Sequence, residues 1–292
     1  MSFIRRNRMF SAPFRQGVAV LSNEELATYA PSVLATAAHE SRSEKFRPIA
    51  TMEVVNGMRK AGFVPVSAQQ SGTRDITKRG FTKHLIRFRR VQDMENPGLR
   101  RVGGTFPEAV LVNANDGTSS YKLYSGLFRI ICLNGMVSME EGGQEVRVGH
   151  RGSQEDVIRK VIEGTFEVLG TADKTMDAAE QWSGIRVGRD HALAFAEAAH
   201  TLRFDDPAAT PIKPAQLLQV RRNEDSAPSA WNVFNVVQEN VIKGGLTGTM
   251  VSPNTGRARQ VRTGEVNGID QNVKLNRALW LLGARFAELA AR

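Results

Sequence analysis

The chain of 292 residues contains a single cysteine, Cys132, so it cannot form a disulfide bond within itself. One cysteine suits a reducing compartment, and we expect a cytoplasmic protein. Cys132 lies in the apolar run 127–133, which is typical of a buried structural thiol rather than a nucleophile. One cysteine and five scattered histidines cannot build a usual structural zinc site, and we expect neither a metal nor a cofactor.

Long apolar runs and nucleotide-binding motifs are absent as well. No segment approaches the roughly 18 apolar residues of a membrane span, and the basic N-terminus lacks the apolar stretch of a secretory signal. The sequence has no Gly-x-x-x-x-Gly-Lys-Ser/Thr loop and no Gly-x-Gly-x-x-Gly between a strand and a helix. These absences argue against a membrane protein, an ATP-driven motor and a dinucleotide enzyme, and we predict no catalytic residues.

Acidic residues are scarce relative to basic ones. The chain has 39 Lys and Arg residues against 30 Asp and Glu residues, a net charge of +9 that favours polyanionic partners. The basic excess is densest in residues 74–101, where nine basic residues stand against three acidic ones. Nucleic acid is therefore the partner that the charge distribution predicts.

The segment 81–91 in this region is predicted to be a strand, because its residue types alternate. One face would carry the side chains that pack on the core, and the other would carry mainly cations. The first set is Thr82, His84, Ile86 and Phe88, and the second is Lys83, Leu85, Arg87 and Arg89. The cationic face suits a phosphate backbone, but the alternative is a solvated face that only raises solubility or blocks unwanted pairing.

Binding would combine neutralised phosphates with stacked bases. The residues predicted to contact nucleic acid are Lys78, Arg79, Lys83, Arg87, Arg89, Arg90, Tyr121, Lys122, Arg129, Arg257 and Arg259. Tyr121 follows a tight-turn signature and is the stacking candidate. Arg257 and Arg259 lie in the Gly/Arg-rich segment 246–264, which we interpret as a loop that either binds phosphate or is simply solvated.

The order of the predicted elements favours an α+β fold, with an antiparallel sheet backed by helices and then a largely helical C-terminal region. We expect an N-terminal arm over 1–24, a sheet domain over 25–152 and a helical region over 153–292. Pro31 should break the first helix near Ala30. The main predicted segments are a helix at 51–61, strands at 63–70, 106–113 and 120–124, and helices at 189–202, 231–243 and 270–290.

Two segments are less clear in the sequence. Residues 125–134 fit both a helix and a strand, and we favour the helix. Residues 136–139 and 145–148 flank Glu140-Glu-Gly-Gly143, so we expect them to pair as a hairpin.

Two blocks of the sequence resemble a known family. The first, 120–137, has an Arg-x-x-Cys-x-Asn-Gly core at Arg129, Cys132, Asn134 and Gly135. The second, 231–245, is followed by Gly256-Arg257 and by 275–280. Together they are similar to the plasmid- and prophage-encoded domain-of-unknown-function family numbered 932, from about residue 46 to the C-terminus. The resemblance implies a role in the replication, recombination or establishment of foreign DNA.

The order of helix and strands is also similar to the core of single-strand annealing recombinases of the Redβ and RecT kind, at the level of fold only. The family blocks further contain a set of polar residues for which both buried hydrogen bonding and function fit, although for Asn134-Gly135 we favour a turn or cap, since both residue types tolerate a positive φ. This set is Asn134, Asn235, Gln238, Glu239 and Asn276.

The leading hypothesis is a non-catalytic DNA-binding protein of a mobile element that prefers single strands and promotes annealing as a homo-oligomeric ring or filament. It has no membrane partner. One alternative is a metal-dependent nuclease using Asp116 and Glu141, which would need carboxylates that converge from separate elements. Another is a module that binds a host defence protein.

Overall fold

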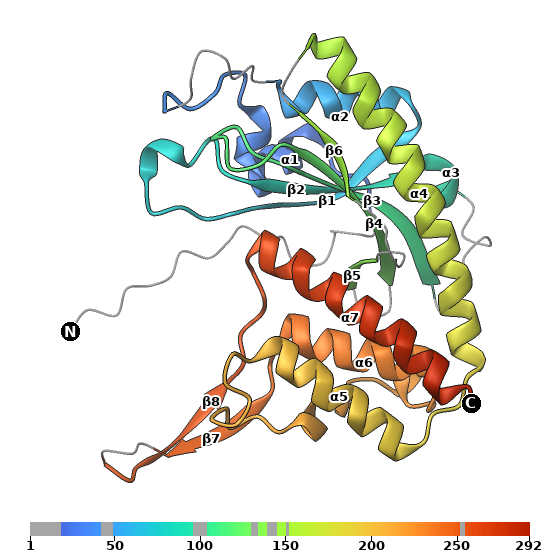
Figure 1. The fold of residues 1–292 in the computed structure, drawn as a ribbon. Helices are drawn as coiled ribbons and strands as arrows, with labels where there is room; N and C mark the ends of the chain where they lie inside the picture. Colours follow the sequence, from blue (N-terminus) through green and yellow to red (C-terminus); the bar gives the residue numbers. More distant parts are fainter. Residues whose placement is uncertain are drawn as a thin grey trace. The chain divides into compact units, whose positions relative to one another are not determined.

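The computed structural model describes residues 19–41, 49–95, 104–129, 134–138, 145–149, 152–251 and 255–292. It confirms the α+β class, with an antiparallel sheet, helices that back it and a helical C-terminal region (Figure 1). The described residues form two compact units. The first contains those up to Met176, and the second contains those from Asp177 to the C-terminus.

The first unit is built on a sheet in the order β1-β2-β3-β4-β5, with β6 also paired to β4, and the described pairs are all antiparallel. Its strands are β1 (Phe63–Gln70), β2 (His84–Arg90), β3 (Thr105–Asn113), β4 (Tyr121–Arg129), β5 (Asn134–Val137) and β6 (Val146–Val148). Its helical elements are α1 (Asn23–Tyr29), η1 (Pro31–Leu34), α2 (Thr51–Lys60), η2 (Ile76–Lys78), α3 (Val91–Glu95) and most of α4 (Gln154–Gly184).

Local sequence explains where the first helices begin and end. Ser22 caps α1: its hydroxyl accepts from the Glu25 backbone N–H, and the Glu25 carboxylate accepts from the Ser22 N–H. Pro31 cannot continue this helix, and the chain turns into η1 as the sequence predicts. The Ser153 hydroxyl likewise accepts from the Asp156 N–H at the start of α4.

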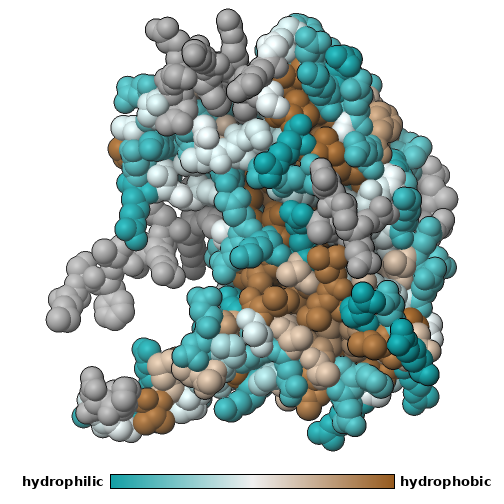
Figure 2. Space-filling view, in the orientation of Figure 1, coloured by the Kyte–Doolittle hydropathy of each residue, from teal (hydrophilic) through white to brown (hydrophobic). Residues whose placement is uncertain are grey.

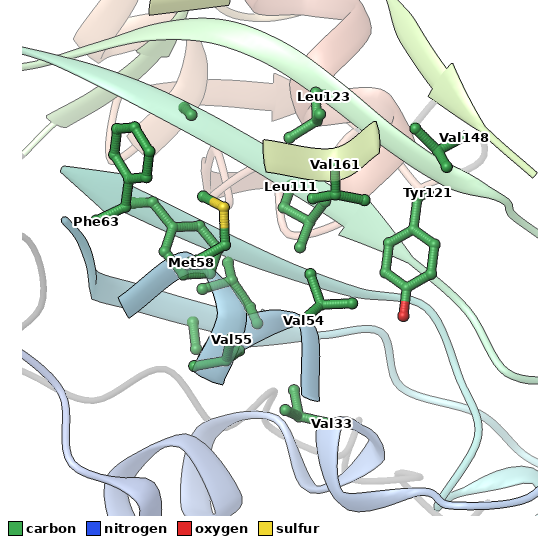
Figure 3. Packing of buried hydrophobic residues seen from close by; sticks show 14 of the residues in the cluster. Val33, Val54, Val55, Met58, Phe63, Leu111, Tyr121, Leu123, Val148 and Val161 are labelled. Carbon is green, nitrogen blue, oxygen red and sulfur yellow. The ribbon is translucent and has the colours of Figure 1, made fainter. Parts of the chain in front are cut away.

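The core of the first unit lies between the sheet and the helices α1, α2 and α4. Figure 3 shows Val54, Val55 and Met58 of α2 pointing toward Leu111 and Leu123 of the sheet. Ile86 and Phe88 belong to the same buried cluster, so the apolar face predicted for the basic strand is confirmed. Burying such side chains contributes about 1.5–3 kcal/mol each.

Two predictions for the end of the sheet were wrong. Residues 125–129 are strand, because β4 continues through them and pairs with residues of β3 from Ala109 back to Thr105. The expected hairpin of 136–139 with 145–148 does not form in the described residues: β5 and β6 each pair with β4 instead. Cross-strand pairing with β3 decided the state of an ambiguous apolar run.

The second unit surrounds α6 (Ala230–Lys243) with α5 (Arg189–Arg203), α7 (Ile269–Ala290), η6 (Pro214–Leu218), η7 (Asn223–Asp225) and the last residues of α4. Aromatic rings fill its centre. Trp182 stacks on Trp280 with the ring centroids 4.7 Å apart, and Phe195 stacks on Phe286 at 4.6 Å. Such pairs add about 0.5–1.5 kcal/mol beyond the area that they bury.

The predicted helices of this unit are confirmed, but the interpretation of 246–264 as a loop was wrong. This segment forms a two-stranded ribbon of β7 (Thr247–Val251) and β8 (Ala258–Arg262), which projects from the unit (Figure 1).

The polar residues of α6 have structural partners. The Gln238 amide donates to Asn276 Oδ1 of α7 at 2.6 Å, and the Glu239 carboxylate holds the Arg222 guanidinium with two hydrogen bonds. Buried polar groups need such partners, so these residues fasten α6 to its neighbours.

Candidate nucleic-acid interface

The two arginines at the centre of the basic strand lie inside the protein. Arg87 is 7% exposed and Arg89 is 1% exposed, and both side chains turn to Glu108 of β3, which is fully buried. Arg87 Nη1 lies 3.1 Å from Glu108 Oε2, and Arg89 Nη2 lies 2.6 Å from Glu108 Oε1. The Arg89 guanidinium also lies 4.2 Å from the centroid of the Phe106 ring. The expectation that these cations form an exposed row was therefore wrong.

Small residues on the neighbouring strands make room for Arg87. A Cβ atom added at Gly135 of β5 would lie 2.5 Å from Arg87 Cζ, and one added at Gly126 of β4 would lie 3.3 Å from Arg87 Nη1. Arg87 Nη1 also donates to the carbonyl oxygen of Met136 at 3.2 Å. Gly135 thus provides the space that the buried guanidinium occupies, which gives this residue of the family block a packing role.

Tyr121, predicted to stack on a base, is fully buried. Its hydroxyl donates to the carbonyl oxygen of Ile49 at 2.9 Å, and burial raises the pKa of this hydroxyl. The ring faces the core of the first unit (Figure 3). The stacking role was therefore wrong, because the side of β4 that carries Tyr121 is the side that the helices cover.

A buried polar cluster lies beside Tyr121. His84 Nδ1 lies 2.8 Å from Ser32 Oγ, and His84 Nε2 lies 3.0 Å from Thr51 Oγ1. Asn113 donates to the same Thr51 hydroxyl at 3.1 Å. These bonds join η1, α2 and the sheet, so His84 is a hydrogen-bonded packing residue, as its place on the inner face predicts.

Four further predicted residues are paired, buried or half-buried. Arg90 makes two hydrogen bonds to the Asp173 carboxylate of α4. Lys122 Nζ lies 3.7 Å from Glu145 Oε1, and Arg129 is only 3% exposed. Lys83 is half-buried at the end of the loop that leads into β2. These positions leave little of the sheet's cationic face open to a ligand.

The connection between β1 and β2 carries exposed cations of the first unit. Arg74 and Arg79 are exposed and Lys78 is partly exposed, with Asp75 the one acidic residue of this stretch. The Lys78 ammonium lies 4.0 Å from the Asp75 carboxylate, a contact too open to neutralise it strongly. Figure 2 shows this projecting connection as largely hydrophilic.

The ribbon of the second unit carries three more exposed cations. Arg257, Arg259 and Arg262 are exposed, and residues 247–262 include no Asp or Glu. Arg259 touches only the Met250 sulfur, at 3.5 Å, and none of the three arginines makes an ion pair within the described part of the chain. The sequence reasoning named these arginines but missed the ribbon. The turn-forming residues 253–256 between two short segments were the signal that could have revealed it.

Of the two residues named for the nuclease alternative, the structure describes Asp116 alone. The Asp116 carboxylate accepts from the backbone N–H and the hydroxyl of Thr118, so it shapes a turn. Glu141 lies outside the described residues, as does Cys132. Within the described ranges, no group of three His, Cys, Asp or Glu side chains is placed to hold a metal ion. Across the same ranges, no helix has the length and apolar character to cross a membrane.

The fold and the exposed cations define an α+β protein whose two units each present a projecting basic hairpin. Residues 38–280 match the family model named Domain of unknown function (DUF932), and the chain belongs to this family. It is 40% identical over 262 residues to UPF0380 protein YafZ of Escherichia coli K12 and 38% identical over 262 residues to UPF0380 protein YfjQ of the same strain. Each match covers 90% of both chains. No solved structure matches the chain.

Proposed function

We propose that this protein binds nucleic acid by neutralising phosphates with the exposed cations of its projecting hairpins. The observation that carries the proposal is the ribbon β7–β8, where three exposed arginines occur in a stretch without an acidic residue. When exposed guanidinium groups contact phosphates, they displace the cations that are condensed on the nucleic acid. The release of these cations supplies affinity that does not depend on the base sequence.

The buried arginines take no part in this proposal. Arg87, Arg89 and Arg129 are buried, and Tyr121 is inaccessible to a base. The residues that we propose for phosphate contact are therefore Lys78 and Arg79 on the first unit, and Arg257, Arg259 and Arg262 on the second.

The proposal covers nucleic acid in general. Preference for single-stranded DNA, annealing by a ring or filament and a setting on a mobile element are finer predictions. They are tested by comparing single- and double-stranded substrates, by following the pairing of complementary strands, and by measuring the mass of the protein in solution.

The first test measures binding to fluorescent single- and double-stranded oligonucleotides by anisotropy across a salt series. The double variant Arg257→Ala/Arg259→Ala should bind all sequences more weakly. Its log–log salt slope should become shallower by about 1.8 on duplex and about 1.4 on single strands, since two phosphate contacts are lost. Arg285→Ala is the matched control, because Arg285 is an exposed arginine of the same unit whose side chain is 63% exposed and pairs with Glu288.

An unchanged salt slope in the double variant would show that Arg257 and Arg259 of the ribbon do not contact phosphates. If the wild-type protein binds no oligonucleotide at moderate salt, the proposal fails and a protein partner becomes the better hypothesis.

A further inference from the structure

The ribbon has two different faces. Antiparallel pairing places Thr247 opposite Arg262, Thr249 opposite Gln260 and Val251 opposite Ala258, so these six side chains share one face. All six residues are exposed. Within the described part of the chain, the side chains of Thr249, Gln260 and Arg262 have no hydrogen-bond partner. One face of the ribbon therefore presents open hydrogen-bonding groups to the surroundings.

The opposite face is partly covered. It carries Gly248, Met250 and Val261, which are half-buried, and the Arg259 guanidinium lies against the Met250 sulfur. The backbone of Thr247 is further held by the Gln216 amide, which donates to its carbonyl oxygen at 2.8 Å. The Gln216 bond attaches the base of the ribbon to the second unit and leaves the side chains of the polar face free.

The ribbon has the size of an element that enters a nucleic-acid groove. Five residues per strand span about 16 Å at roughly 3.3 Å per residue. The major groove of B-form DNA is about 12 Å wide and admits a two-stranded ribbon. At about 3.4 Å per base pair, the polar face would lie along roughly five base pairs.

The side chains at the middle of the polar face are of the types that read base edges. The Gln260 amide has both a donor and an acceptor and can bond the N6 and N7 positions of adenine, and Thr249 opposite it supplies a hydroxyl and a methyl group. Residues 247–262 contain no aromatic side chain, so this element lacks the stacking surface that single-strand binders use.

Arginines stand at the ends of the same element. Arg257 precedes β8 at the outer end. At the base, Arg262 Nη2 and Arg221 Nη2 both approach Gly245, at 3.4 Å and 3.7 Å from the position that a Cβ atom there would occupy. Arg221 is already held there, because its Nε donates to Asn240 Oδ1 and its Nη2 donates to the carbonyl oxygen of Gly244, so Arg262 is the guanidinium left to contact a phosphate beside the ribbon.

We infer that the polar face of β7–β8 lies in the major groove of duplex DNA and reads a short sequence there through Thr249 and Gln260. This inference rests on the proposed function and deepens it, because it adds base readout to phosphate contact and names duplex DNA in place of the single-strand preference expected from the sequence. Arg262 on the polar face and Arg257 near the outer end hold the ribbon to the backbone, and the two central residues supply the preference.

The test selects binding sites from a random-sequence duplex library with the purified full chain. The wild-type protein should enrich a motif of about five base pairs and bind it at least roughly 5-fold more tightly than a random duplex. Thr249→Ala/Gln260→Ala should bring this ratio close to 1, because binding to the enriched motif falls to the level of the random duplex. Gln271→Ala, which alters an exposed glutamine of α7 away from the ribbon, should keep the wild-type ratio.

A second arm uses the enriched duplex with glucosylated hydroxymethylcytosine, which fills the major groove. The preference should then disappear. The inference is overturned if the wild-type protein binds DNA but enriches no motif, if the double variant keeps the preference, or if the filled groove has no effect. In those cases the proposed phosphate binding still stands. If the wild-type protein binds no DNA at any of the salt concentrations tested, both the proposed phosphate binding and the inferred base readout are overturned.

Discussion

Arginines of β2 and arginines of the β7–β8 ribbon differ in burial and partners, although both groups lie on antiparallel strands. Arg89 is buried against Glu108 and Phe106, whereas Arg259 is exposed and, among the described residues, its guanidinium has a methionine sulfur and no carboxylate as its partner. A buried guanidinium depends on its carboxylate partner, because an uncompensated charge inside a protein is costly. An exposed guanidinium without a carboxylate keeps its charge available to a ligand. Whether an arginine stabilises the fold or remains available to a ligand therefore depends on its carboxylate partner and not on the residue type.

The largest effect is expected from Glu108→Gln, which leaves two buried guanidinium groups without a neutralising carboxylate. The free energy of unfolding should fall by about 3–5 kcal/mol. Urea denaturation measures this change. Arg259→Ala is the matched control at the ribbon and should alter stability by less than about 0.5 kcal/mol.

An apolar replacement of the triad sharpens the same comparison. Arg87→Met/Arg89→Met/Glu108→Leu removes both charges together with their partner, so much of the stability lost in Glu108→Gln should return. If this triple variant folds but loses its affinity for nucleic acid, the buried arginines contribute to binding and the contrast between the two regions is wrong.

A smaller loss is expected from Gly135→Ala, because the new Cβ atom would lie 2.5 Å from Arg87 Cζ. Overpacking of this kind costs about 1–3 kcal/mol. Gly170→Ala is the control of opposite sign: Gly170 is an exposed helical residue of α4 with no atom within 4 Å of an added Cβ. It should stabilise the protein by about 0.5–1 kcal/mol. Equal effects of both substitutions on denaturation would show that Gly135 does not make room for Arg87.

The smallest effect concerns Glu145, whose carboxylate pairs with the cations Lys122 and Arg147 of the sheet. Burial alone would raise the pKa of its carboxyl group, but the Tyr124 hydroxyl, Lys122 and Arg147 together lower this pKa below its ordinary value of 4.5. The carboxylate therefore adds stability above the pKa of the unfolded chain, and this stability is lost as the pH falls through the lower folded pKa. Glu145→Gln should be less stable than wild type at pH 7, and the difference should shrink under acid. A constant difference from pH 7 to pH 3 would contradict the ion pairs.

Much of the fold follows from local sequence. Pro31 ends α1, Ser153 caps α4, and the apolar periodicity identifies α2, α5, α6 and α7. The face assignment of β2 also follows from alternation alone, since Ile86 and Phe88 lie in the core. These features depend on neighbours in the chain, which a single sequence displays directly.

The errors share a different cause. Residues 125–129 and the strands of the ribbon are extended because they pair with other strands. A short segment of sequence does not show which strand it will pair with. The alternation of residue types also predicted which side chains share a face of β2. It did not predict that Glu108 of β3 would form ion pairs with Arg87 and Arg89 on the cationic face. Tyr121 was misplaced for the same reason, since its environment is made by α2 and the residues before it.

The sequence by itself determined the basic excess, most of the helices and the two faces of the basic strand, because composition and periodicity are local properties. Only the tertiary structure decided which cations remain available. Burial and ion pairing depend on residues brought together from distant parts of the chain, and they enclosed Arg87 and Arg89 while leaving Arg257, Arg259 and Arg262 exposed on a ribbon.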